Sequence, residues 1–278
     1  QLIFLPLVVL AIVAGPMMHF DLAGLTGVSR PQVLWDHMLL IYCFFAALSP
    51  MWLLMQPRGA LGGYFLYVIV IVGVVGVVVG GLSGNLTIAA PAVSSAHLFS
   101  FNGTTPPLLP VLFITIACGA CSGFHGLVCS GTTSKQIDRE THMQPVGYGG
   151  MLAEGFVALI ALVTVMIVTP ESIKGLKPGT IYGNGIGNFL TILIGKENLP
   201  FAITFGAMAF STFVFDTLDV CTRLGRYIIQ ELFNWKGISG SVAATLLTVA
   251  LPVYFISTAP EGSWVNFWTL FGSANQLL

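Results

Sequence analysis

The residues best suited to chemistry in this sequence lie in one apolar, glycine-rich stretch, FITIACGACSGFHGLVCSGTTSK, which runs from Phe113 to Lys135. A glycine inside a helix costs about 1 kcal/mol relative to alanine, so this density of glycines weakens a continuous helix. One interpretation is close packing of helices through small residues. The other is an unwound helix whose freed backbone groups bind an ion or a substrate inside a protein cavity. The candidate binding residues are Gly119, Ser122, Gly123, Phe124 and His125.

His125 is the ionisable residue at the centre of this stretch. An ionisable side chain in an apolar segment is a functional candidate, and histidine can exchange a proton near physiological pH. The alternative is an interior histidine that is simply satisfied by hydrogen bonds. Both interpretations stay open on the sequence alone.

Carboxylates form a second candidate group. Asp216, Asp219 and Arg223 lie in FVFDTLDVCTRLGR, where spacings of three and four residues place them along one helix face. They predict either an i,i+4 pair between Asp219 and Arg223 at the helix end or a gate whose pairing changes with substrate. Glu154, just inside a later apolar run, is either an interfacial carboxylate or an ion or proton site.

Motifs for soluble enzyme chemistry are absent from the sequence. It has no P-loop, no HExxH and no GxSxG motif, so we expect neither direct ATP use nor hydrolytic catalysis. Cys118 and Cys121 have CxxC spacing, but no second CxxC completes a metal site. We therefore expect a protein that is not an enzyme and that has no cofactor and no metal. A formal net charge of −1 gives no basic footprint for nucleic acid.

Composition decides what must position these residues. Of the 278 residues 55% are hydrophobic and 8% are charged, against about 25% charged in soluble domains. Stretches such as Val68 to Val79 are apolar on every face, which excludes the alternating strands of a membrane barrel. The sequence predicts an all-α, polytopic bundle of membrane-spanning helices in contact with the lipid bilayer. A span needs about 20 apolar residues, and the expected spans of this single domain lie near 2–14, 33–55, 61–82, 108–128, 150–168, 201–220, 238–256 and 264–278.

The loops give an expected orientation. If the spans alternate, one side holds six basic residues: Arg58, Lys135, Arg139, Arg223, Arg226 and Lys236. The other side holds four, so the positive-inside rule places the first side in the cytoplasm. The segment Gly183 to Gly195 is too short to span and is expected to be re-entrant or interfacial. Both ends of the sequence lie in apolar runs, and we expect it to be part of a longer protein.

Several long motifs carry a family resemblance. In chain order they are WLLMQPRG, FITIACGACSGFHGLVCSGTTSKQIDRET, VGYGGMLAEG, FVFDTLDVCTRLGRYIIQEL and FGSANQLL. Together they resemble the carbon starvation protein A (CstA) family over most of the sequence. The resemblance implies a many-spanning transporter of the inner membrane, implicated in uptake of peptides and, in some members, pyruvate. It also implies a core similar to the amino acid–polyamine–organocation superfamily, which uses broken helices.

The resemblance turns these candidates into a mechanism. It implies a secondary active transporter for a small carboxylate-bearing nutrient, used during carbon starvation and driven by a proton or sodium gradient. By analogy with the superfamily, the hydroxyl pair Ser211 and Thr212 would complete a sodium site facing the broken helix. A nutrient sensor that binds the same solute without net flux is the alternative function.

Overall fold

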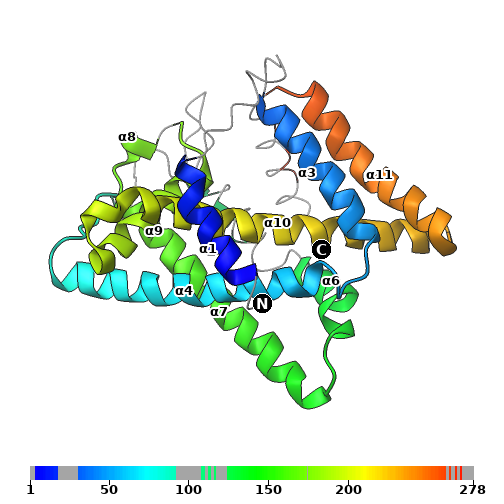
Figure 1. The fold of residues 1–278 in the computed structure, drawn as a ribbon, viewed down its shortest axis with the longest axis horizontal. Helices are drawn as coiled ribbons and strands as arrows, with labels where there is room; N and C mark the ends of the chain where they lie inside the picture. The colour runs from blue at the N-terminus through cyan, green and yellow to red at the C-terminus, as the bar shows by residue number, and fades with distance from the viewer. Residues whose placement is uncertain are drawn as a thin grey trace.

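The structure is a computed structural model. It describes residues 4–17, 31–91, 108–109, 112–113, 116, 124–173, 175–260, 263, 267 and 270. Within these ranges the protein is all-α, with no strand (Figure 1). The expected spans near 108–128 and 264–278 fall largely outside the described residues, as do Gly119, Ser122 and Gly123.

Within the described ranges, four helical segments are long and apolar enough to cross a membrane: Met55–Leu82, Glu140–Met166, Lys196–Leu232 and Gly237–Thr258. They contain α4 (Met55–Leu82), α7 (Met143–Met166), α10 (Leu199–Leu232) and α11 (Gly237–Thr258). Two shorter apolar helices are α1 (Phe4–Ala14) and α3 (Pro31–Leu48). The chain is therefore part of a multi-pass membrane protein, and these six helices overlap six of the expected spans.

Helix α3 is shorter than the expected span near 33–55. It ends at Leu48 because Pro50 follows within two residues, and a proline can neither donate the next helical hydrogen bond nor allow the preceding residue an easy helical conformation. Residues 51–54 form a turn, and α4 begins at Met55. This break brings Arg58, in the first turn of α4, close to the end of α3.

The centre of the bundle is α9 (Pro178–Ile194), the segment that was expected to be re-entrant or interfacial. It packs against α10, α4 and α7, and its residues Tyr182, Ile186 and Phe189 are buried in the main hydrophobic core. Glycines allow this close approach, since a Cβ on Gly187 would lie 2.8 Å from Ile203 Cγ1. Although α9 is short, it is packed on several sides by the longer helices.

Helix α10 joins two groups of helices (Figure 1). Its first half packs with α4 and α9, and its second half packs with α3 and α11. With 34 residues it is about 51 Å long, well beyond the ~30 Å of a bilayer core. It must therefore tilt or project from the membrane. The buried polar residues described on α10 all lie in its second half.

The remaining elements are short. They are the helices α6 (Phe124–Gly131) and α8 (Pro170–Ile173) and the single 3-10 turns η1 (Gly15–Met17), η3 (Thr133–Lys135), η4 (Glu140–His142) and η5 (Lys196–Asn198). Of these, α6 packs against α10.

Candidate functional site

The second half of α10 buries a row of polar side chains. Asp219, Thr222, Arg223 and Arg226 are 1%, 8%, 3% and 8% exposed, respectively. Their spacing places them on one side of the helix, toward α3 and α11. Charged groups inside a membrane bundle are costly unless they are paired, so their partners decide what this row can do.

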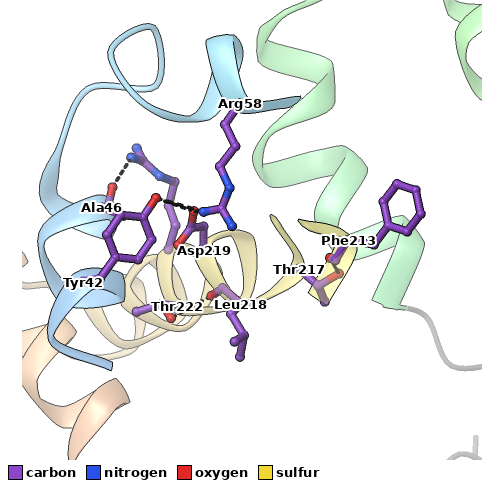
Figure 2. Close-up of polar contacts among 9 residues, drawn as sticks. Tyr42, Ala46, Arg58, Phe213, Thr217, Leu218, Asp219 and Thr222 are labelled. Carbon is purple, nitrogen blue, oxygen red and sulfur yellow. Dashed lines mark hydrogen bonds and ion pairs between the residues drawn. The ribbon is translucent and has the colours of Figure 1, made fainter. Parts of the chain in front are cut away.

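Asp219 is paired with Arg58 of α4. The guanidinium Nη1 of Arg58 donates to Oδ2 of Asp219 and also to the hydroxyl of Tyr42, at 2.8 Å. The Tyr42 hydroxyl in turn donates to the same Oδ2 at 3.2 Å. These three side chains, which come from α3, α4 and α10, form a closed triangle of polar contacts that we call the Arg58–Asp219–Tyr42 cluster (Figure 2).

This cluster is almost removed from solvent. The Asp219 side chain is 2% exposed and the Arg58 side chain is 19% exposed. Oδ1 of Asp219 accepts no well-formed hydrogen bond from the described residues, although the thiol of the buried Cys43 lies near this carboxylate. The ring of Phe215 lies on the guanidinium, 5.6 Å from Cζ to the ring centroid. Breaking such a buried ion pair is costly, and the carboxylate still has one oxygen that can accept a further hydrogen bond.

Arg223 has a different partner from the one the helix spacing predicted. Its Nη2 donates to the backbone carbonyl of Ala46 at 2.9 Å and to that of Ser49. These carbonyls lie at the end of α3, where the last carbonyls of a helix lack intrahelical donors and attract a cation. The expected Asp219–Arg223 pair is therefore wrong for this conformation, because Asp219 pairs with Arg58 and Arg223 caps α3.

Asp216 lies one turn before Asp219 on α10 and is half-buried. It interacts electrostatically with the same Arg58. The hydrogen-bonded ion pair of Arg58 is with Asp219, and Asp216 feels the charge of the same guanidinium.

The hydroxyl pair Ser211 and Thr212 lies on α10 in half-buried positions. Thr212 donates its hydroxyl to the carbonyl of Met208 at 2.8 Å, and its methyl group faces Gly62 of α4. The pair thus lies at the α4–α10 contact. Whether it faces the glycine-rich segment lies outside the described residues.

Other predicted residues are not joined to this cluster in the described part of the chain. Phe124 and His125 are the first two residues of α6, and their side chains lie outside the described parts. Glu154 lies on α7 in an exposed stretch and has an interaction of its own. Among the described residues no group of three His, Cys, Asp or Glu side chains could hold a metal ion.

Arg58 and Tyr42 are the cluster residues that sequence reasoning missed. Arg58 was treated as a loop cation that sets orientation, and Tyr42 as part of an apolar span. Two local signals were present: Arg58 follows closely after an apolar run, and it lies in the WLLMQPRG motif that carries part of the family resemblance. Its pairing with Asp219 joins residues 161 positions apart, which no spacing rule detects.

Three of the basic residues expected on one side belong to or contact the second half of α10. Arg223 is part of this helix, Arg58 pairs with its Asp219, and the Lys135 ammonium is 4.6 Å from the centroid of the Tyr227 ring. On the other expected side, Lys177 donates to Gln32 at 2.7 Å. The orientation expected from the loops stays a prediction.

Comparisons with known proteins identify relatives. The family model described as "Carbon starvation protein CstA" matches residues 1–184 and 175–278. The peptide transporter CstA of Mycobacterium tuberculosis is 32% identical over 351 aligned residues, which cover 100% of this chain and 45% of that protein. The peptide transporter CstA of Escherichia coli is 32% identical over 94% of this chain and 44% of its own length.

A relative with another name is also similar. The pyruvate/proton symporter BtsT of Escherichia coli is 30% identical over 86% of this chain and 44% of its own length. No solved structure matches. The chain spans less than half the length of these curated relatives. On the family match over its whole length, the chain belongs to the carbon starvation protein CstA family.

Proposed function

We propose that this chain is part of a secondary active transporter that takes up a small carboxylate-bearing nutrient across the inner membrane. The substrate is a peptide, an amino acid or pyruvate, and a proton or sodium gradient drives the uptake during carbon starvation. The names of the relatives support a transporter, since they include peptide transporters and a pyruvate/proton symporter. The apolar helices supply the membrane-spanning part.

The observation that carries this proposal is the Arg58–Asp219–Tyr42 cluster. It ties three helices together by charge inside an apolar bundle, and its partners belong to different helices. A transporter needs such contacts to break and re-form as helices move, because a bistable contact turns small shifts into two discrete states. In this proposal Asp216, one turn before Asp219 and within the electrostatic influence of Arg58, is the carboxylate with which Arg58 would pair in a second state.

The substrate and ion would bind at the glycine-rich segment. Gly119, Ser122, Gly123, Phe124 and His125 would form a broken helix, whose half-helix N-terminus can hold a carboxylate. His125 would carry a coupling proton; alternatively, Ser211 and Thr212 would complete a sodium site. A core similar to the amino acid–polyamine–organocation superfamily is part of this proposal, and Glu154, Asp216, Asp219 and Arg223 would act in coupling or gating.

The test is accumulation of radiolabelled small peptides and pyruvate in proteoliposomes that hold the full-length gene product. An imposed proton or sodium gradient is the only energy source. Gradient-dependent accumulation supports the transporter and identifies the ion. Binding without accumulation, in vesicles shown to be sealed, supports the alternative function of a nutrient sensor.

A further inference from the structure

A second polar pocket lies where α10 ends and α11 begins. It has a volume of about 370 Å³, and its polar lining comes from Arg226, Gln230, Gly237 and Ser241. It lies beyond the Arg58–Asp219–Tyr42 cluster, toward the end of α10, and shares no residue with it.

Arg226 is the charged residue of this pocket, and it is 8% exposed. Its guanidinium lies over the Tyr227 ring at 4.6 Å, and its Nε makes no hydrogen bond to the described residues. Among the described residues no ion pair joins Arg226 to a carboxylate, since Asp219 pairs with Arg58 and Asp138 with its own neighbours. The polar partner of Arg226 is the neutral hydroxyl of Tyr227. A buried cation without a carboxylate partner is costly, and an anion would offset that cost.

The start of α11 adds donors to the same pocket. Gly237 and Ile238 line it, and the first N–H groups of a helix have no intrahelical acceptor and carry partial positive charge. The N-cap residue Lys236 makes no side-chain capping bond that would satisfy them. Gln230 donates to the Ser241 hydroxyl at 3.0 Å, which fixes its amide at the pocket wall. A buried arginine, an anchored amide and an uncapped helix N-terminus together make an anion site.

We propose that this pocket binds a phosphate-type anion, and that the headgroup phosphate of an acidic phospholipid is its occupant. The remaining lining residues, Leu48, Ile238 and Val242, are apolar, and Ile238 is 85% exposed at the edge of the pocket. A headgroup would place its phosphate on Arg226 and its glycerol and acyl carbons along this apolar edge. In the orientation expected from the loops, the site lies on the side with more basic residues, which attracts acidic lipid.

The test measures binding of phosphatidylglycerol to the purified full-length gene product in detergent by native mass spectrometry. Phosphatidylcholine serves as the neutral probe, and inorganic phosphate is titrated as a competitor. We expect Arg226→Gln to weaken phosphatidylglycerol binding by about tenfold or more, as the loss of a charge-assisted hydrogen bond predicts. The matched control Arg139→Gln removes an exposed cation of the same expected side and should leave binding unchanged.

The outcomes separate the sources of the anion. Arg226-dependent binding of phosphatidylglycerol but not of phosphatidylcholine supports the lipid site. If inorganic phosphate binds in an Arg226-dependent way and the acidic lipid is not preferred, the pocket is an anion site for free phosphate and the lipid assignment is overturned. Equal losses in the two arginine variants, or no loss in either, overturn the proposal. If Arg226→Gln does not give a monodisperse protein, Gln230→Ala is tested in its place, with the same direction of change expected.

Discussion

Arg223 donates a hydrogen bond at 2.9 Å to the backbone carbonyl of Ala46, across 177 positions of sequence. The contact joins the middle of α10 to the last turn of α3 and replaces the donors that the helix end lacks. A side chain that looked like half of a local ion pair therefore holds two helices together. This arrangement has a direct consequence for stability.

Arg223→Met should destabilise the protein by about 1.5–3 kcal/mol, because hydrogen bonds from a charged donor to the α3 carbonyls are lost. Thermal unfolding of the purified full-length gene product in detergent measures the change. Arg139→Met serves as the control, since the Arg139 side chain is 74% exposed. A melting temperature equal to that of the control variant would contradict the capping role.

The Arg58–Asp219 pair predicts strong coupling between two positions. Arg58→Met or Asp219→Leu alone should each cost about 3–5 kcal/mol, because each leaves one buried charge without its partner. The double variant should recover much of that loss but not gradient-driven accumulation, since the exchangeable contact is gone. Unfolding and uptake of the four proteins form the measurement, and single-variant costs that simply add would count against the pair.

Tyr42→Phe removes a hydroxyl that accepts from Arg58 and donates to Asp219. The ion pair itself remains, so the loss should be about 1 kcal/mol, well below that of Asp219→Leu. Tyr67→Phe on α4 is the matched control, because Tyr67 is 68% exposed. Unfolding temperatures that rank Tyr42→Phe with the control would show that the hydroxyl contributes nothing to the cluster.

Substitution of Gly187 tests the packing of α9. Gly187→Ala should lower the free energy of unfolding by about 1–3 kcal/mol, because the new Cβ would lie 3.0 Å from the backbone nitrogen of Ile203. A backbone atom cannot move away by a change of side-chain rotamer. Gly63→Ala on α4 meets nothing within 4 Å and should be neutral or stabilising by up to about 1 kcal/mol. The opposite order of unfolding temperatures would mean that α9 does not pack this closely.

The glycine-rich segment predicts a loss of transport rather than of stability. Ser122→Ala and His125→Ala should insert normally and lose most gradient-driven uptake in proteoliposomes. If His125 carries the coupling proton, its variant should still bind substrate while accumulation fails. Wild-type uptake by both variants at matched insertion would refute the assignment of the binding site.

The helices could be predicted because a bilayer demands long apolar runs, and such runs are visible in a single sequence. The end of α3 was also encoded locally, in Pro50, although the predicted span ran past it. The packing of α9 among the other helices could not be predicted from the sequence. Its 17 residues are too few to span a bilayer, and the contacts of its glycines with neighbouring helices are visible only in the structure. Its length predicted a re-entrant or interfacial segment, whereas packing through small residues lets it lie in the core of the helix bundle.

The sequence predicted the site residues that lie on one helix, but not their partners on other helices. Asp216, Asp219 and Arg223 were found because they recur on a single face, but their partners come from α3 and α4. The i,i+4 rule gives a few tenths of a kcal/mol, and the tertiary contacts with Arg58 and the α3 carbonyls outweigh it. Arg58 went unnoticed because long-range pairing has no local pattern.

The unbroken length of α10 gives the molecule a mechanical property. One rigid rod passes from the group formed by α4 and α9 to the pair formed by α3 and α11. Because its hydrogen-bond ladder is continuous, the two groups share one backbone element, and a displacement of α3 and α11 reaches α4 and α9 along a single helix rather than through a loop.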